Sequence, residues 1–175
     1  MGKSNLVNYG IYNEQSDIRA HVAPQCRRVF VYQTRAMLNL LEYHKYPQTG
    51  ASQEAVDGIT GWGYLIPIEA IPDLRILRPA EYRWHDFPRR TASTSEKGAA
   101  AMRLIKDILS LGHFPLWVNA YENKQRDVQI SGTDILICCR QRIQVKCDWR
   151  AGRREWGGSG NLFIQTAERN PRGMI

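Results

Sequence analysis

The expected fold is decided by one stretch of the chain, which reads Ile130-Ser-Gly-Thr-Asp134-Ile-Leu-Ile-Cys-Cys-Arg140-Gln-Arg-Ile-Gln144-Val-Lys146-Cys-Asp148. Two short apolar runs flank a polar corner, a pattern typical of two strands joined by a turn. Successive side chains of a strand point to opposite faces, so Gln144 and Lys146 share one face of the second strand. The stretch predicts a hairpin that carries an acid at its mouth and a Gln-x-Lys pair on its second strand.

The length of the corner determines the position of Asp134. A three-residue corner at 140–142 pairs Asp134 with Asp148 and places it on the face of Gln144 and Lys146, diagonal to the lysine at roughly 7 Å. A two-residue corner would send Asp134 to the opposite face. No glycine marks the corner, so both lengths stay open, and the longer one would bring the three side chains within reach of one bound ion and its water.

A helix is predicted upstream of the hairpin, over residues 91–111. Ser93 followed by Glu96 is the spacing of a capping box, in which each side chain accepts a backbone N–H of the first turn. A wide apolar stripe follows, and Gly112 supplies the residue that ends the helix. Residues 113–119 are expected to form a strand beside this helix.

The N-terminal half has a weaker pattern. Apolar residues at intervals of three and four predict an amphipathic helix over residues 28–46. The apolar segment 61–66 reads as a strand that Pro67 either ends or confines to a sheet edge, and 74–78 reads as a second extended segment. The polar first twenty residues are expected to be partly disordered.

These elements together resemble the PD-(D/E)XK nuclease superfamily over about residues 93–166. The resemblance rests on the helix with Glu96, the strand at 114–118, Gly132-Thr133-Asp134 and Ile143-Gln144-Val145-Lys146. It is nearest to the homing-endonuclease-like branch with Gln in the second position. It implies an α/β fold with a restriction-endonuclease-like core, a mixed central sheet flanked by helices, at residues 91–175. Residues 1–90 would be an α+β extension that contacts DNA or forms an oligomer interface, and the strand at 160–165 would close the site.

The same resemblance implies the chemistry of the site. Asp134, Gln144 and Glu96 would hold Mg²⁺ or Mn²⁺, and Lys146 would be the catalytic lysine, so all four residues would act in phosphodiester hydrolysis. A divalent ion with oxygen ligands neutralises developing charge and lowers the pKa of an attacking water. Gln144 stands where most relatives have Glu or Asp, which removes one negative charge from the site.

The charge of the chain points to a polyanionic partner. The 175 residues include 24 Lys and Arg against 17 acids, a net charge of +7, and such a basic balance is typical of nucleic-acid binding. The expected phosphate contacts are arginines in two segments. One segment is a flexible loop after the hairpin that would become ordered on DNA, and the other is an aromatic-rich segment before the predicted helix. They are Arg150, Arg153, Arg154, Arg89 and Arg90.

Other segments exclude several classes of protein. No apolar run is long enough to span a membrane, no signal peptide is recognisable, and we expect a cytoplasmic protein. The four cysteines lack the spacing of a zinc site and are expected to be reduced, buried thiols.

Several alternatives stay open at this point. Asp134 and Lys146 also fit a cross-strand ion pair, and the capping box alone explains Glu96. A nucleic-acid-binding protein that keeps the nuclease fold without activity is one alternative function, and an interaction subunit is another. A homodimer is expected for a nuclease, because two symmetric sites are the simplest means of cutting both strands.

Overall fold

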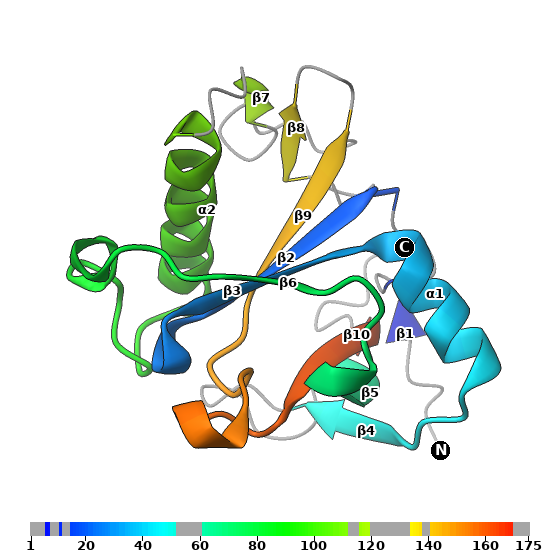
Figure 1. Ribbon diagram of the computed structural model, residues 1–175. Coiled ribbons are helices and arrows are strands. Elements are labelled where there is room, and N and C mark those ends of the chain that lie inside the picture. Colours follow the sequence, from blue (N-terminus) through cyan, green and yellow to red (C-terminus); the bar gives the residue numbers. More distant parts are fainter. Residues whose placement is uncertain are drawn as a thin grey trace.

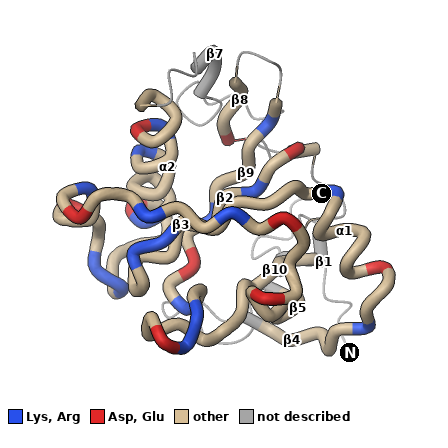
Figure 2. The backbone as a smooth tube through the Cα atoms, viewed as in Figure 1, with Lys and Arg blue, Asp and Glu red and all other residues tan. Residues whose placement is uncertain are grey.

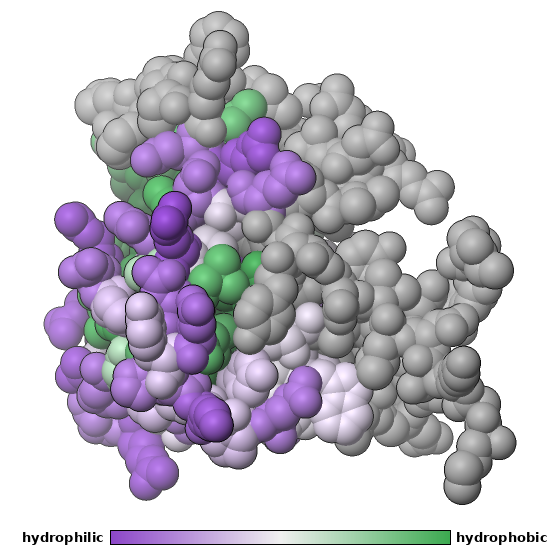
Figure 3. Space-filling model, turned by 90° about the vertical axis from the view of Figure 1, so that its right-hand side faces the viewer, coloured by the Kyte–Doolittle hydropathy of each residue, from purple (hydrophilic) through white to green (hydrophobic). Residues whose placement is uncertain are grey.

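The described part of the chain folds into a mixed α/β structure with two sheets and two α-helices (Figure 1). The computed structural model describes residues 6–7, 11, 15–51, 61–111, 116–119, 134–137 and 141–169. None of the helices within these ranges is long and apolar enough to cross a membrane. On the face seen in Figure 3, hydrophilic residues cover most of the described surface, with small hydrophobic patches between them.

The larger sheet has six strands in the order β6-β3-β2-β9-β8-β7. In chain order the strands are β2 (Ile18–Ala23), β3 (Arg28–Gln33), β6 (Arg75–Leu77), β7 (Leu116–Asn119), β8 (Ile135–Ile137) and β9 (Arg142–Cys147). Strand β2 runs parallel to β9, and all other neighbouring strands are antiparallel. The parallel contact joins segments more than a hundred residues apart in sequence at the centre of the sheet.

The smaller sheet has four antiparallel strands in the order β1-β10-β5-β4. They are β1 (Leu6–Val7), β4 (Gln48–Ala51), β5 (Gly61–Pro67) and β10 (Asn161–Arg169). Strand β5 has a neighbour on each side, so the predicted edge position was wrong, whereas the alternative of a strand that ends at the proline agrees to one residue with β5, whose last residue is Pro67. Proline has no backbone N–H to donate to a neighbouring strand. Pro67 is nevertheless tolerated at the end of β5, because the pairing with β4 ends at Tyr64 and Pro67 has a neighbour only on the β10 side, where it pairs with Asn161.

The two α-helices are α1 (Thr34–Tyr43) and α2 (Thr94–Leu111), and short 3-10 turns occur at η2 (Pro24–Cys26), η3 (Ile68–Ala70), η4 (Glu81–Trp84) and η5 (Arg154–Trp156). The predicted helix at 91–111 is confirmed as α2. The predicted helix at 28–46 was half wrong, because residues 28–33 form β3. Their β-branched and aromatic side chains favour a strand, and hairpin pairing with β2 supplies their backbone hydrogen bonds.

Two hydrophobic cores lie on opposite faces of the six-stranded sheet. One core joins apolar residues of α2, including Ala101 and Ile105, to Val22, Ile143 and Val145. The other joins Phe30 and Tyr32 to α1 and to the four-stranded sheet. In Figure 1, α2 stands on one side of the strands, while α1 and the small sheet lie on the other. The six-stranded sheet is thus buried on both faces.

Both sheets combine strands from the two sides of the predicted boundary at residues 90 and 91. Strand β2 pairs with β9, and β5 pairs with β10. The predicted N-terminal extension therefore supplies central strands rather than an appendage, at least among the described residues.

Candidate functional site

The β8–β9 hairpin brings Asp134 and Gln144 to the same face of the sheet. Ile135 pairs with Ile143, and the backbone N–H of Asp134 donates to the carbonyl of Ile143 at 2.9 Å. This register continues to place Asp134 opposite Gln144, so the predicted pairing of Asp134 with Asp148 was wrong. The two registers differ by an even number of residues, and for that reason the predicted face is correct although the partner is not. The corner residues 138–140 lie outside the described residues.

The carboxylate of Asp134 holds Gln144 and its strand directly. Its Oδ2 atom accepts a hydrogen bond of 2.8 Å from Gln144 Nε2 and one of 2.7 Å from the backbone N–H of Val145. Gln144 is 7% exposed, and its carbonyl oxygen Oε1 has no hydrogen-bond partner among the described residues. A buried, unpartnered amide oxygen beside a carboxylate is suited to receive a donor or a cation.

Lys146 lies two residues further along β9 on the face of Gln144, and it is half-buried. Its charge acts on Asp134 across the hairpin. Burial raises the pKa of Asp134 above its ordinary value, while the Val145 N–H, the Lys146 ammonium and the Arg19 guanidinium act in the opposite direction. Desolvation is the largest effect, so the carboxylate is held in an environment that disfavours its charge.

Three buried polar residues from β2 and β3 extend this site, and they escaped prediction. Arg19 pairs with Gln144 across the parallel β2–β9 contact and with Tyr32 across the β2–β3 hairpin, while His21 pairs with Lys146. Their exposed fractions are 1% for Arg19, 1% for His21 and 2% for Tyr32. A row of polar side chains therefore crosses four adjacent strands, in the order Tyr32, Arg19, Gln144 and Asp134 (strands in Figure 1).

A sequence signal for these residues did exist. Arg19 and His21 alternate with Ala20 and Val22, which is the period-two pattern of a strand with one polar face. The expectation of partial disorder in the first twenty residues was wrong for 18–20, which begin β2. Their position beside Gln144 had no local signal, because it depends on strand pairing between distant segments.

The buried residues of β2 and β3 form a hydrogen-bonded cluster. The hydroxyl of Tyr32 lies 2.9 Å from His21 Nε2, and Arg19 is hydrogen-bonded to Tyr32. Burial lowers the pKa of His21 well below its ordinary value, and the nearby Arg19 and Lys146 lower it further. Burial also raises the pKa of Tyr32 to about 12. His21 and Tyr32 are consequently neutral at neutral pH.

Glu96 is not brought to this site. Its carboxylate oxygen Oε2 accepts hydrogen bonds from the backbone N–H of Ser93 at 2.9 Å and from its hydroxyl at 2.6 Å. The Ser93 hydroxyl oxygen in turn accepts the backbone N–H of Glu96 at 3.2 Å, which completes the predicted capping box. These hydrogen bonds lower the pKa of Glu96. Helix α2 packs on the face of β9 opposite to Gln144 and Lys146, so Glu96 and Asp134 stand on opposite sides of the sheet.

The strand after the hairpin also differs from the expectation. Residues 160–165 were expected to close the site, but β10 belongs to the four-stranded sheet, where Gln165 pairs with Gly63. The strand that lies beside β9 is β2. The N-terminal segment therefore supplies the neighbours of the Gln-x-Lys pair.

The arginine-rich loop after β9 is held in place by Asp148. The carboxylate of Asp148 accepts backbone hydrogen bonds from Arg150 at 2.9 Å, Ala151 at 3.1 Å and Phe163 at 3.3 Å. Burial raises the pKa of Asp148. A second set of backbone hydrogen bonds, including Gly160 N to Gly152 O at 2.8 Å, closes the loop on itself. The loop thus has a defined set of hydrogen bonds in the structure, and its flexibility before DNA binding stays a prediction.

The predicted phosphate contacts differ in how freely they face solvent. Arg150 and Arg154 are exposed, whereas the guanidinium of Arg153 lies 5.1 Å from the centre of the Trp156 ring. Arg28 of β3 lies at the same distance from that ring. Figure 2 shows basic and acidic residues side by side in this loop, where Glu155 lies 3.6 Å from Arg153. The loop is thus a mixed rather than a purely basic surface.

Arg89 and Arg90 lie in the segment that leads to α2, and both are exposed. Lys97 Nζ donates a hydrogen bond of 3.0 Å to the carbonyl of Arg90, which fixes the backbone of this segment to the first turn of α2. Their aromatic neighbours Trp84 and Phe87 pack against the α2 core. Trp84 and Phe87 therefore serve packing, whereas Tyr82 of the same segment is exposed.

Within the described ranges, no three His, Cys, Asp or Glu side chains come together as a metal-binding group. Cys26 and Cys147 are free thiols, Cys26 buried and Cys147 half-buried. Burial raises the pKa of both thiols, that of Cys147 to about 12, so neither is a reactive thiolate at neutral pH. Cys138 and Cys139 lie outside the described residues.

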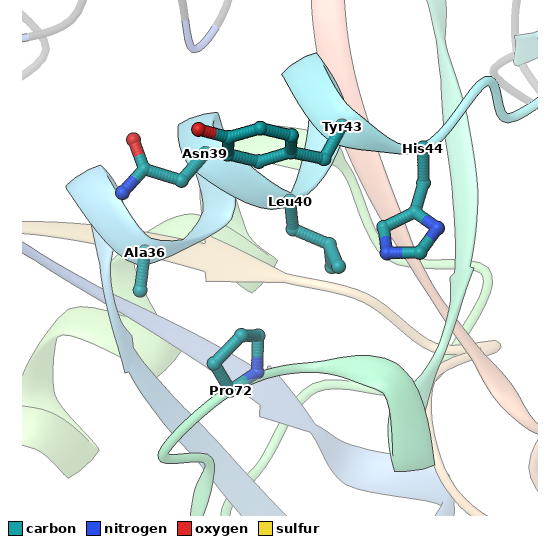
Figure 4. Close-up of a pocket in the computed structure, with 6 residues that line it drawn as sticks. All are labelled: Ala36, Asn39, Leu40, Tyr43, His44 and Pro72. Carbon is teal, nitrogen blue, oxygen red and sulfur yellow. The ribbon is translucent and has the colours of Figure 1, made fainter.

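A groove of about 340 Å³ lies away from this site, between α1 and the turn at Pro72 (Figure 4). Leu40 and Ala36 point from the helix toward Pro72, while the ring of Tyr43 lies along the outer side of the helix. The groove contains none of the predicted site residues. Its lining lacks a carboxylate, an arginine or a lysine, which separates it chemically from the polar row.

Comparison with protein-family models, with curated proteins and with solved structures found no match to this chain. The function of the polar row is therefore inferred from its geometry and chemistry.

Proposed function

We propose that this chain is a Mg²⁺- or Mn²⁺-dependent DNA endonuclease whose active site lies on β8 and β9, with Asp134 and Gln144 as metal ligands and Lys146 as the catalytic lysine. The six-stranded sheet with α2 would then be a restriction-endonuclease-like core of the PD-(D/E)XK type. The observation that carries the proposal is the direct hydrogen bond of 2.8 Å between Gln144 Nε2 and Asp134 Oδ2. It joins the acid of the first strand to the Gln-x-Lys strand on one face.

The donor atoms fit a hard divalent cation. The bond through Nε2 leaves the carbonyl oxygen of Gln144 as the free end of the amide, and this oxygen is buried without a partner among the described residues. Amide and carboxylate oxygens are the ligands that Mg²⁺ and Mn²⁺ prefer, with water and phosphate oxygens at the remaining positions. When bound, such an ion would supply charge neutralisation and a more acidic water for phosphodiester hydrolysis.

Lys146, together with Arg19 of the polar row, would act on the phosphate and on Asp134. Lys146 would stabilise the negative charge that develops on the phosphate. Arg19, buried behind Gln144, adds a second positive charge that acts on Asp134. Since one carboxylate stands beside two cations, the row attracts phosphate more strongly than a site with two carboxylates would. The amide at position 144 leaves metal binding dependent on the phosphate oxygens of the DNA.

Cleavage of plasmid and branched DNA in Mg²⁺ or Mn²⁺ tests the proposal. Asp134→Asn and Lys146→Ala are expected to reduce the cleavage rate by at least about a hundredfold, because each removes a group that acts on the transition state. Asp86→Asn and Lys45→Ala are matched controls, since both residues are exposed and neither lies in a strand of the six-stranded sheet. Circular dichroism of each variant checks that it is folded. Cleavage that survives both site substitutions unchanged would exclude this site.

A second candidate function is a nucleic-acid-binding protein without catalysis. It is favoured by the engagement of Asp134 Oδ2 with two N–H donors and by the place of Glu96 in the capping box, which leave Asp134 as the one carboxylate of the row among the described residues. In that case DNA binding would fall with salt, and calorimetry with Mg²⁺ or Mn²⁺ in the presence of a short duplex would give no metal-binding signal. The nuclease is expected to give both a metal signal and cleavage.

A homodimer belongs to the same proposal. Two symmetric copies would place one site on each DNA strand. Sedimentation of the chain with and without a short duplex measures this, and a monomer on the duplex would restrict the activity to single-strand nicking.

A further inference from the structure

Two buried polar atoms on adjacent strands lack hydrogen-bond partners among the described residues. They are Nδ1 of His21 on β2 and Oε1 of Gln144 on β9. His21 is 1% exposed and Gln144 is 7% exposed, so bulk water does not solvate either atom. Leaving a buried donor or acceptor unsatisfied costs about 1–3 kcal/mol, and such atoms in native proteins usually bind an ordered water.

The two side chains are neighbours on one face of the six-stranded sheet. Arg19 pairs with Gln144, and His21 pairs with Lys146, so His21 and Gln144 are diagonal neighbours on one face of the parallel β2–β9 pair. Strand spacing and rise per residue give a separation on the order of 8 Å between their Cα atoms. A single water that bridges the two atoms needs them on the order of 5 Å apart, a separation that this Cα distance permits.

The hydrogen-bond chemistry of the cluster makes the two atoms complementary. Arg19 can only donate, so Tyr32 accepts the hydrogen bond from Arg19. The buried Tyr32 hydroxyl then finds its acceptor at His21 Nε2, 2.9 Å away. A neutral imidazole that accepts at Nε2 carries its proton on Nδ1. His21 Nδ1 is thus a donor without an acceptor, and Gln144 Oε1 is an acceptor without a donor.

We propose that one buried water molecule bridges His21 Nδ1 and Gln144 Oε1, and that His21 is thereby a positioning residue for the Gln144 amide. The water accepts from Nδ1 and donates to Oε1. A continuous chain of hydrogen bonds then runs from Arg19 through Tyr32, His21 and the water to Gln144, and from Gln144 Nε2 to Asp134. The second lone pair of Oε1 remains directed away from the water.

The role of His21 in catalysis rests on the proposed nuclease function, whereas the bridge itself does not. The amide is held from both ends, by the water at Oε1 and by Asp134 at Nε2. Its orientation decides whether a carbonyl oxygen or an NH₂ group is presented to the ion. Groups that orient metal ligands in this way typically contribute tenfold to a hundredfold to affinity or rate.

Two substitutions of His21 with similar size and polarity distinguish a role in the water bridge from a role in packing alone. In His21→Asn the side-chain amide lies near the position of Nδ1 and keeps a donor toward the water. In His21→Gln the amide lies near the position of Nε2 and the donor toward Gln144 is lost. The side-chain N–H signals of Gln144 in the ¹⁵N–¹H NMR spectrum, assigned by their absence in Gln144→Glu, report the orientation of its amide.

The expected result is that His21→Gln shifts the Gln144 signals and accelerates their hydrogen exchange, while His21→Asn leaves them close to wild type. In cleavage assays, His21→Gln is expected to lower kcat about tenfold with KM unchanged, and His21→Asn is expected to restore most of kcat. Equal behaviour of the two variants in the NMR measurement would overturn the proposal.

The two readouts also separate this proposal from the proposed function. If wild-type protein does not cut DNA, the nuclease function fails, and the NMR comparison alone decides the bridge. If His21→Gln does not fold, a high-resolution crystal structure of the wild type decides instead. Density for one water within hydrogen-bond distance of both atoms supports the bridge, and direct contacts of the two atoms with other groups overturn it.

Discussion

Gln144 and Asp134 face one another across the β8–β9 hairpin, with Gln144 Nε2 donating to Asp134 Oδ2 at 2.8 Å. The neutral amide allows this contact, because a second carboxylate at position 144 would repel the first in a buried site. The two side chains therefore satisfy part of each other's hydrogen-bonding capacity, through Gln144 Nε2 and Asp134 Oδ2. This contact leaves one amide oxygen for an ion or a water.

Gln144→Glu tests the balance between this contact and metal binding. Without metal, the variant is expected to lose about 1–3 kcal/mol of stability, since a hydrogen bond becomes a contact between two buried acids. Addition of Mg²⁺ is expected to stabilise the variant more than the wild type, by about 2.7 kcal/mol when the ion is at one hundred times its Kd. Urea unfolding at pH 8 with and without Mg²⁺ measures both effects. Gln144→Ala is the control, since it removes the hydrogen bond without adding a charge, and equal responses of the two variants to Mg²⁺ would argue against a metal site.

His21 should make the protein sensitive to mild acid. Its folded-state pKa lies well below the ordinary value of 6.5, so below that pH the unfolded chain binds a proton that the folded chain does not. Stability is expected to decline as the pH falls below 6.5, with a slope of up to about 1.4 kcal/mol per pH unit from this residue. Urea unfolding between pH 5 and 8 should show this slope in wild type and in His85→Asn, an exposed control, and a smaller slope in His21→Asn. Parallel curves of stability against pH for all three proteins would contradict the attribution of this slope to His21.

Gly152 is expected to be indispensable to the arginine loop. Its φ of +128° is strained for any residue with a side chain, and a Cβ atom would lie 2.7 Å from the Sγ of Cys26. Gly152→Ala should therefore destabilise the protein by about 1–3 kcal/mol. Gly98→Ala is the matched control, because nothing lies within 4 Å of the added Cβ, and alanine should stabilise α2 there by about 0.5–1 kcal/mol. Thermal unfolding distinguishes the two, and similar melting temperatures would contradict the close packing of the loop on Cys26.

Glu96 is expected to act on stability and not on cleavage. Glu96→Gln retains the hydrogen bonds of a capping box but removes the negative charge that a metal ligand would need. Its cleavage rate and metal dependence should equal those of the wild type, because α2 lies on the opposite face of the sheet from Gln144. Glu96→Ala, which loses the capping box, should melt at a lower temperature with its activity retained below the melting range. A loss of metal binding in Glu96→Gln would instead show that Glu96 is a metal ligand.

The exposed arginines should determine the salt dependence of DNA binding. Arg150→Ala and Arg154→Ala are each expected to reduce the slope of log K against log salt by about 1, as removal of a phosphate contact does. Arg103→Ala, exposed on α2, is the control for net charge. Fluorescence anisotropy with a short duplex between 50 and 300 mM salt measures the slopes. Identical slopes for all three variants would show that the loop does not touch phosphate.

The sequence by itself determined the features that depend on neighbouring residues. Helix α2 and its capping box followed from Ser93, Glu96 and the apolar stripe, since these contacts lie within one or two turns. The shared face of Gln144 and Lys146 followed from the period of two in strands, whereas the face of Asp134 depended on the length of the corner. The exact partner of Asp134 did not follow from the sequence, because a register shift by an even number of residues keeps the same face.

Only the tertiary structure decided which segments surround the Gln-x-Lys pair. The parallel pairing of β2 with β9 places Arg19 and His21 beside Gln144 and Lys146, and the packing of α2 on the other face separates Glu96 from Asp134. Such pairings join segments more than a hundred residues apart. They are fixed by the burial of both faces of the sheet rather than by local preference, so a local pattern identified the acid, the amide and the lysine but not the buried polar residues behind them.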